Sequence, residues 1–187
     1  MNFKISYIQN YISPSNLDTN AILKIYGTSV DSLESALKNT LFIYQNITKG
    51  FQKELAKQIE DVLKKHFQGV GGQLCFGRLY SPVLGEKPDV AIGLKGRSKK
   101  IFIEIEFRPN EHKDIVKFLI GHKKQTLELA ILIVPVDRKT ITKYYPKRYK
   151  TKYHTMTEFG KCVKIIEELQ SDCPIWVMGF DGKWVSA

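Results

Sequence analysis

Two glutamates stand two residues apart in a segment that is otherwise apolar. Glu104 and Glu106 alternate with bulky apolar residues in the segment 99–107 (KKIFIEIEF), and this period of two predicts a β-strand with one apolar face. Both carboxylates then project from the same face of a sheet, where like charges at that spacing repel each other. We therefore expect a cation beside them.

A third carboxylate, Asp89, stands near the start of the preceding extended segment, 88–94 (PDVAIGL). The four residues between the two segments (KGRS) predict a turn, so that 88–94 and 99–107 form an antiparallel hairpin. The hairpin can bring Asp89 close to Glu104 and Glu106. Three carboxylates with no cysteine and no evident histidine suit Mg²⁺, which takes one or two carboxylates, several waters and substrate phosphate.

An ordinary surface strand is the alternative for these acids. Glu-x-Glu on an outward face can be solvated, or it can pair with the neighbouring basic residues Lys99, Lys100 or Arg108. Pro-Asp after Gly-Glu-Lys is also common turn chemistry.

The basic residues are concentrated in one stretch. The chain has 29 Lys and Arg against 19 Asp and Glu, a formal net charge of +10, and this balance favours a polyanionic partner. The segment 138–152 (RKTITKYYPKRYKTK) holds seven basic residues and no acid. Its tyrosines offer hydroxyls for phosphates and rings for stacking, and its proline disfavours a continuous helix. We expect a loop along a nucleic-acid backbone or groove; the alternative is a solvated basic loop.

The remaining pattern predicts helices around a central sheet. We expect amphipathic helices at 18–23, 29–45, about 46–67, 110–124 and 157–170, and strands at 73–80, 88–94, 99–107, 129–136 and 174–180. The nearly continuous apolar run 129–136 is typical of a strand that is covered on both faces. Residues 3–12 could be a strand or an arm. The order of elements predicts an α/β domain with a mixed sheet.

The composition excludes several classes of protein. The three cysteines, Cys75, Cys162 and Cys173, contain no CxxC pair, so neither a zinc knuckle nor a disulfide framework is indicated, and we expect a reduced, cytoplasmic setting. No apolar run of eighteen residues and no signal-peptide pattern is present. The length suits a single domain, 1–187, with an N-terminal arm and helix in 1–45 and a core in 46–180 that carries the basic loop 138–153.

The combination of Pro88-Asp89, a turn, and Glu104-Ile105-Glu106 in an apolar strand resembles the PD-(D/E)xK nuclease motif, in the variant where Glu replaces Lys. It is most similar to the type II restriction endonucleases of the BamHI and BglII kind. The order of the segments EIEFRPN, LAILIVPVD and CPIWVMGF is also similar to that group. The resemblance covers about 88–180 and implies a restriction-endonuclease-like core, Mg²⁺-dependent hydrolysis of double-stranded DNA, and a bacterial or archaeal source.

The resemblance also implies roles for individual residues. Asp89, Glu104 and the carbonyl of Ile105 would hold the metal, and Glu106 would orient or deprotonate the attacking water or bind a second metal. Members of the superfamily often carry a further acid on the helix before the sheet; Glu60 is our preference over Glu54 and Asp61. DNA contacts are expected from two parts of the chain: the residues after the Glu104–Glu106 strand, Arg108 and Lys113, and the basic segment, with Lys143, Tyr144, Lys147, Arg148, Tyr149, Lys150 and Lys152.

An enzyme that cuts both strands of a palindrome would be a homodimer with one site per strand. The helix predicted at 110–124 could either contact DNA or form the dimer. Two other functions stay open: a repair or junction-resolving nuclease with the same core, and a basic DNA-binding protein without catalysis.

Overall fold

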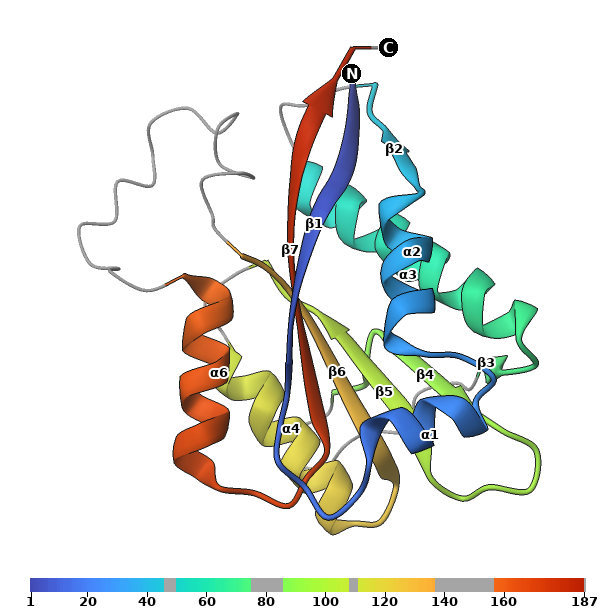
Figure 1. The fold of residues 1–187 in the computed structure, drawn as a ribbon, viewed down its shortest axis with the longest axis vertical. Helices are drawn as coiled ribbons and strands as arrows, with labels where there is room; N and C mark the ends of the chain where they lie inside the picture. Colours follow the sequence, from blue (N-terminus) through green and yellow to red (C-terminus); the bar gives the residue numbers. More distant parts are fainter. Residues whose placement is uncertain (46–49, 75–85, 108–110, 137–156, 187) are drawn as a thin grey trace.

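The computed structural model describes residues 1–45, 50–74, 86–107, 111–136 and 157–186 (Figure 1). Within these ranges lie seven strands and five helices. In chain order they are β1 (Asn2–Ile12), α1 (Thr19–Ile25), α2 (Val30–Lys38), β2 (Leu41–Ile43), α3 (Phe51–Gly69), β3 (Gln73–Leu74), β4 (Val90–Gly93), β5 (Lys100–Ile105), α4 (Glu111–Lys123), β6 (Leu127–Pro135), α6 (Glu158–Leu169) and β7 (Ile175–Val185).

The strands form one mixed sheet in the order β2-β1-β7-β6-β5-β4-β3. The central strand β6 runs parallel to β5 and β7, and the other pairs are antiparallel. Every residue of β6 is buried, as expected for a parallel strand covered on both faces. The structure therefore confirms the predicted α/β class and mixed sheet, and it confirms that β4 and β5 form an antiparallel hairpin.

Two apolar cores lie on opposite faces of the sheet. Helices α1, α2 and α3 cover the face to which Ile101, Ile103 and Ile105 of β5 belong, and α4 and α6 cover the face to which Phe102 belongs (Figure 1). Alternate residues of a strand point to opposite faces, so Glu104 shares its face with Phe102 and lies on the side of α4. Of the helices in the described ranges, none combines the length and apolarity needed to cross a membrane.

The N-terminal segment is a strand of the sheet. β1 pairs with β7 along its length, from Asn2 opposite Val185 to Ile12 opposite Trp176. The helix predicted at 29–45 is shorter than expected: it begins after the N-cap Ser29 and ends at the C-cap Asn39, and β2 follows as the edge strand on β1. The prediction for this second half was wrong because Leu41, which continues the apolar spacing, is an exposed residue of β2, whereas its neighbour Phe42 is buried against Phe3 of β1.

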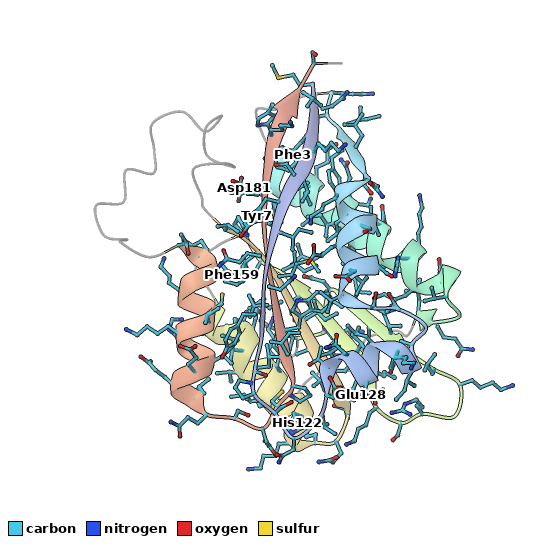
Figure 2. The ribbon with its side chains drawn as sticks, in the orientation of Figure 1. Phe3, Tyr7, His122, Glu128, Phe159 and Asp181 are labelled. Carbon is cyan, nitrogen blue, oxygen red and sulfur yellow. The ribbon has the colours of Figure 1, made fainter. Side chains whose placement is uncertain are left out.

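A buried acid ties the far end of the sheet to α1. Glu128 of β6 accepts hydrogen bonds from the hydroxyl of Tyr26, at 2.5 Å, and from the guanidinium of Arg97, at 2.5 Å to Nη2. Figure 2 shows Glu128 near α1, well away from Phe3 at the other end of the sheet. A buried carboxylate is stable only when it is paired and hydrogen-bonded. These two partners therefore explain how Glu128 can be buried.

Candidate active site

The β4–β5 hairpin places Asp89 beside Glu104. The pairing of Val90 with Ile103, extended by one residue, sets Asp89 opposite Glu104. Asp89 Oδ2 accepts a hydrogen bond of 2.8 Å from the backbone nitrogen of Ile105. The carboxylate of Asp89 is thus held at the end of β5, on the face toward α4.

Glu104 is buried, with 4% of its surface exposed. The alternative of a solvated acid on an outward strand face therefore does not hold for Glu104. Burial, and then the negative charge of Asp89, raise the pKa of Glu104 to about 8, although the ammonium of Lys117 acts in the opposite direction. A carboxyl group with this environment favours a nearby cation when it is ionised. Perturbed carboxyl groups of this kind are concentrated at functional sites.

Helix α4 adds a lysine and an aspartate to these two acids. Lys117 Nζ lies 3.1 Å from Glu104 Oε1 and 2.5 Å from Asp114 Oδ1, and it also lies 3.1 Å from Glu86 Oε2. Burial raises the pKa of Asp114, Lys117 opposes this, and the charge of Asp89 raises it further. Asp89 therefore affects the pKa of both Glu104 and Asp114. Four acids form one electrostatic cluster with Lys117 and, at its exposed edge, Lys113, so that the acids outnumber the lysines.

This donor set fits a small hard cation. In an extended strand the N–H and C=O of a residue point to the same side, so the carbonyl of Ile105 lies on the same edge of β5 as the carboxylate of Asp89, to which its N–H donates. Two carboxylates and one carbonyl leave places for the waters and phosphate that Mg²⁺ keeps. No three His, Cys, Asp or Glu side chains in the described ranges form a metal-holding group by themselves. A metal here would need the carbonyl, water or substrate as well.

Glu106 follows the last residue of β5 and is half-buried. Its backbone nitrogen donates to the carbonyl of Ile133, at 2.9 Å, so that the chain still follows β6 at this point. It is two residues from Glu104, as predicted. Glu106 is therefore adjacent to the cluster in the sequence. Its role as a general base or as a ligand of a second metal stays a prediction.

Glu60 does not join the cluster. It lies on α3, whose apolar residues pack on the opposite face of the sheet from Glu104, and it forms an ion pair with Lys64 on the same helix. Among the described contacts of Glu104 none comes from α3. We leave Glu60 out of the proposed site.

Most of the predicted DNA-contacting residues lie outside the described ranges. These are Arg108, Lys143, Tyr144, Lys147, Arg148, Tyr149, Lys150 and Lys152. Lys113 is described: it lies on α4, its side chain is 54% exposed, and it pairs with Glu86. Lys113 is therefore at the open side of the acidic cluster, where a phosphate backbone could reach it.

Sequence reasoning missed Asp114 and Glu86, and it placed Lys117 only on a helix that could contact DNA or form the dimer. A signal was present, because Asp114 and Lys117 are one turn apart and adjoin Ile115 and Phe118, which are the apolar residues of the same helix. Charged residues on a buried stripe indicate a polar partner inside the protein.

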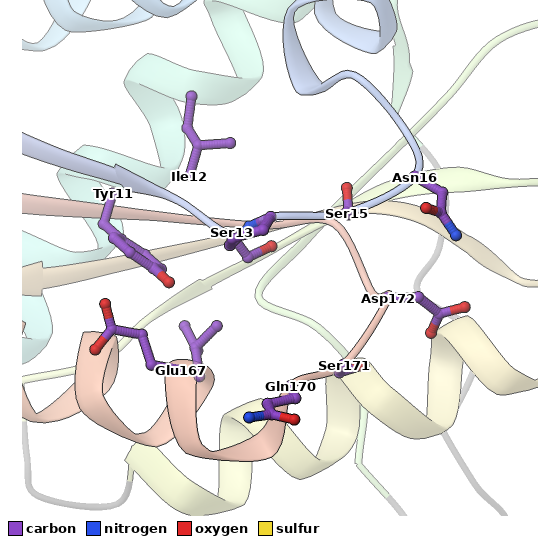
Figure 3. Close-up of a pocket in the computed structure, with 11 residues that line it drawn as sticks. Tyr11, Ile12, Ser13, Ser15, Asn16, Glu167, Gln170, Ser171 and Asp172 are labelled. Atoms are coloured by element: carbon purple, nitrogen blue, oxygen red, sulfur yellow. The ribbon is translucent and has the colours of Figure 1, made fainter.

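A pocket of about 620 Å³ lies elsewhere, where the ends of β1 and α6 meet. Figure 3 shows Tyr11, Ser13 and Asn16 on one side of it and Glu167 and Asp172 on the other. β1 is three strands away from β5 in the sheet, and none of the acids of the cluster lines the pocket. We do not assign the candidate site to it.

Comparison with known proteins gives a fold. No protein-family model and no curated protein sequence matches the chain. The structure is similar to that of restriction endonuclease BglII in complex with a DNA 16-mer, with a TM-score of 0.52 and 15% sequence identity; the match covers 97% of this chain and 79% of that one. The chain has a BglII-like restriction-endonuclease fold. Free BglII also matches, with a TM-score of 0.47 and 13% identity over 97% of this chain and 82% of that one.

The BglII-like fold confirms the resemblance stated from the PD and ExE segments, at the level of architecture. It extends that resemblance beyond 88–180, because nearly the whole chain matches. The part before residue 88, which the sequence motif left out, belongs to the same fold.

Proposed function

We propose that this protein is a Mg²⁺-dependent endonuclease that hydrolyses double-stranded DNA at a specific sequence, as a type II restriction enzyme does. One observation carries the proposal: Asp89, hydrogen-bonded to the Ile105 backbone, lies beside the buried Glu104 in a BglII-like fold. The two acids come from two strands of one hairpin and lie side by side. A protein that only binds DNA does not need such a pair of acids.

Asp89, Glu104 and the carbonyl of Ile105 would hold the metal ion. Bound there, Mg²⁺ would supply charge stabilisation for the phosphate and would make a water molecule easier to deprotonate. The hydrogen bond from the Ile105 nitrogen fixes the orientation of the Asp89 carboxylate. Glu106 is proposed to orient the attacking water or to accept its proton.

DNA is the proposed partner because the protein is strongly basic and because the matching BglII structure is a DNA complex. Lys and Arg in 138–152 are proposed to neutralise phosphates, and Lys113 would do so at the mouth of the acidic cluster. A homodimer would supply one active site for each strand.

A plasmid and phage-DNA cleavage assay tests the proposal. We expect the purified protein with Mg²⁺ to cut phage DNA into a fixed ladder of fragments, and we expect EDTA to prevent it. Sequencing of the fragment ends then gives the recognition site. The catalytic variant Glu104→Ala should bind a duplex containing that site, in Ca²⁺, within about tenfold of the wild-type affinity.

The other outcomes decide between the alternatives. Cleavage of branched or damaged substrates without a fixed ladder would favour a repair or junction-resolving nuclease. DNA binding with no cleavage of any of these substrates in Mg²⁺ or Mn²⁺ would contradict the enzyme and leave a basic DNA-binding protein.

A further inference from the structure

Lys117 lies in an unusual environment for a lysine on a DNA-binding protein. Its side chain is 8% exposed, and its ammonium contacts the carboxylates of Glu104, Asp114 and Glu86. Buried lysines are rare unless they are paired. A helix that only presents basic residues to DNA would leave this side chain in solvent, as it leaves Lys113.

The cluster has more acid than a structural ion pair needs. Asp114 alone, 2.5 Å from Lys117 on the same helix, could neutralise it. Glu104 and Glu86 also contact the ammonium, although Glu86 is shared with Lys113, and Asp89 lies opposite Glu104 on the neighbouring strand. Because a buried ion pair by itself contributes little net stability, stability alone does not explain why three acids contact this one ammonium.

The position of the ammonium relative to Glu104 suggests what it does. Glu104 would hold the metal in the function proposed above, on which this inference rests. Glu86 is 30% exposed and Lys113 more so, so the cluster is open to solvent on that side. The three N–H donors of Lys117 face Glu104, Asp114 and Glu86. A phosphate group brought to Glu104 by a bound metal would reach the ammonium by taking the place of Glu86, the most exposed of the three acids.

The geometry points to Lys117 as a catalytic residue of this site, one that donates hydrogen bonds to a non-bridging oxygen of the scissile phosphate. Asp114 is its positioning residue. In the step itself, the oxygen of water bonds to phosphorus and the bond from phosphorus to the 3′ oxygen breaks. The attacking water loses one proton to Glu106 or to solvent, and the leaving oxygen gains one from solvent. Lys117 keeps its proton and stabilises the charge that develops on the phosphate.

Single-turnover cleavage of a duplex containing the wild-type cut site, at saturating Mg²⁺, tests this. We expect Lys117→Met to lower the cleavage rate by about 10² to 10³-fold, as for removal of one transition-state donor, with the affinity for DNA in Ca²⁺ changed less than threefold. Lys117→Arg should recover part of the rate. Asp114→Asn should lower the cleavage rate less than Lys117→Met does. When Asp114→Asn is added to Lys117→Met, it should not lower the rate further, because Asp114 acts through Lys117.

The double variant Asp114→Asn/Lys117→Met removes one charge of each sign, so it can fold even if Lys117→Met alone does not. Lys161→Met is the matched control: Lys161 forms an i,i+3 pair with buried Glu158 on α6, at 3.2 Å, like that of Lys117 with Asp114. It should lower the unfolding temperature and leave the cleavage rate unchanged. Binding of Mn²⁺ to the DNA-free protein gives a second readout, and the double variant should bind Mn²⁺ within about threefold of wild type.

A double variant that folds and cleaves within threefold of the wild-type rate would overturn the role of Lys117 while the nuclease stands. Tighter Mn²⁺ binding with an unchanged rate would overturn it too, since Lys117 would then be a counter-ion that competes with the metal. A rate deficit that is seen only at limiting Mg²⁺ and disappears at saturating Mg²⁺ would do the same. If the wild-type protein cuts no DNA, the proposed function fails first, and the role of Lys117 fails with it.

Discussion

Replacing Glu104 by glutamine should make the metal-free protein more stable at alkaline pH. Glu104 is 4% exposed, and in the folded protein burial and the charge of Asp89 raise its pKa from 4.5 to about 8 in spite of Lys117. The folded state therefore binds a proton more tightly than the unfolded state does. Stability from this group is complete below pH 4.5 and is lost as the pH rises to about 8.

The size of the effect follows from the difference between the two pKa values. At 1.36 kcal/mol for each pH unit, the rise from 4.5 to about 8 corresponds to about 5 kcal/mol lost by the wild type at pH 9. Glutamine carries no charge and still offers an oxygen to Lys117. We expect Glu104→Gln to exceed the wild type by about 2 to 5 kcal/mol at pH 9, and to differ by less than about 1 kcal/mol at pH 5.

Urea unfolding in EDTA at pH 5 and pH 9 measures this difference. Glu128→Gln is the control, because Glu128 is also 4% exposed but is held by Tyr26 and Arg97; its replacement should stabilise the protein at neither pH. Equal stability of Glu104→Gln and wild type at pH 9 would refute the reasoning, since Glu104 would then carry no penalty for its charge.

The remaining predictions concern pH, DNA binding and the sheet. At limiting Mg²⁺, the cleavage rate should rise with pH toward about 8 and level off above it, because protons compete with the metal for Glu104, and more Mg²⁺ should move the rise to lower pH; a flat profile would contradict this. Neutralising Lys147, Arg148 and Lys150 together should weaken DNA binding and flatten its dependence on salt, whereas an unchanged slope would show that the segment does not contact DNA. Gly182→Ala should destabilise the fold by about 1 to 3 kcal/mol, because the added Cβ would lie 2.3 Å from a ring carbon of Phe3; denaturant unfolding equal to wild type would contradict the close packing of β1 on β7.

The elements closest to the candidate site could be predicted from local pattern. The alternation in 99–107 gave β5, the KGRS turn gave the hairpin, and the unbroken apolar run gave the central strand β6. Each of these signals is contained within a few residues, since side-chain period and turn type are local properties. The neighbourhood of Asp89 and Glu104 follows directly from that hairpin.

The other strands and the other residues of the site depend on contacts between distant parts of the chain. β1 becomes a strand because β7, at the other end of the sequence, pairs with it, and β2 depends on β1 in turn. The sequence of α4 places Asp114 and Lys117 beside buried residues, but it does not show their partner, Glu104, which the sheet brings beneath that helix. Helical spacing alone could not show which side of the sheet α4 would cover, nor that α3, with Glu60, would cover the other.

The effect of Asp89→Ala on cleavage tests the central claim most directly. The wild type and this variant would be compared in single-turnover cleavage with Mg²⁺ and in DNA binding with Ca²⁺. The control is Glu34→Ala, which removes a partly buried acid of α2 that pairs with Lys38. The account predicts that Asp89→Ala loses cleavage by at least about 10³-fold while it binds DNA like the wild type. An Asp89→Ala variant that cuts at the wild-type rate would contradict it.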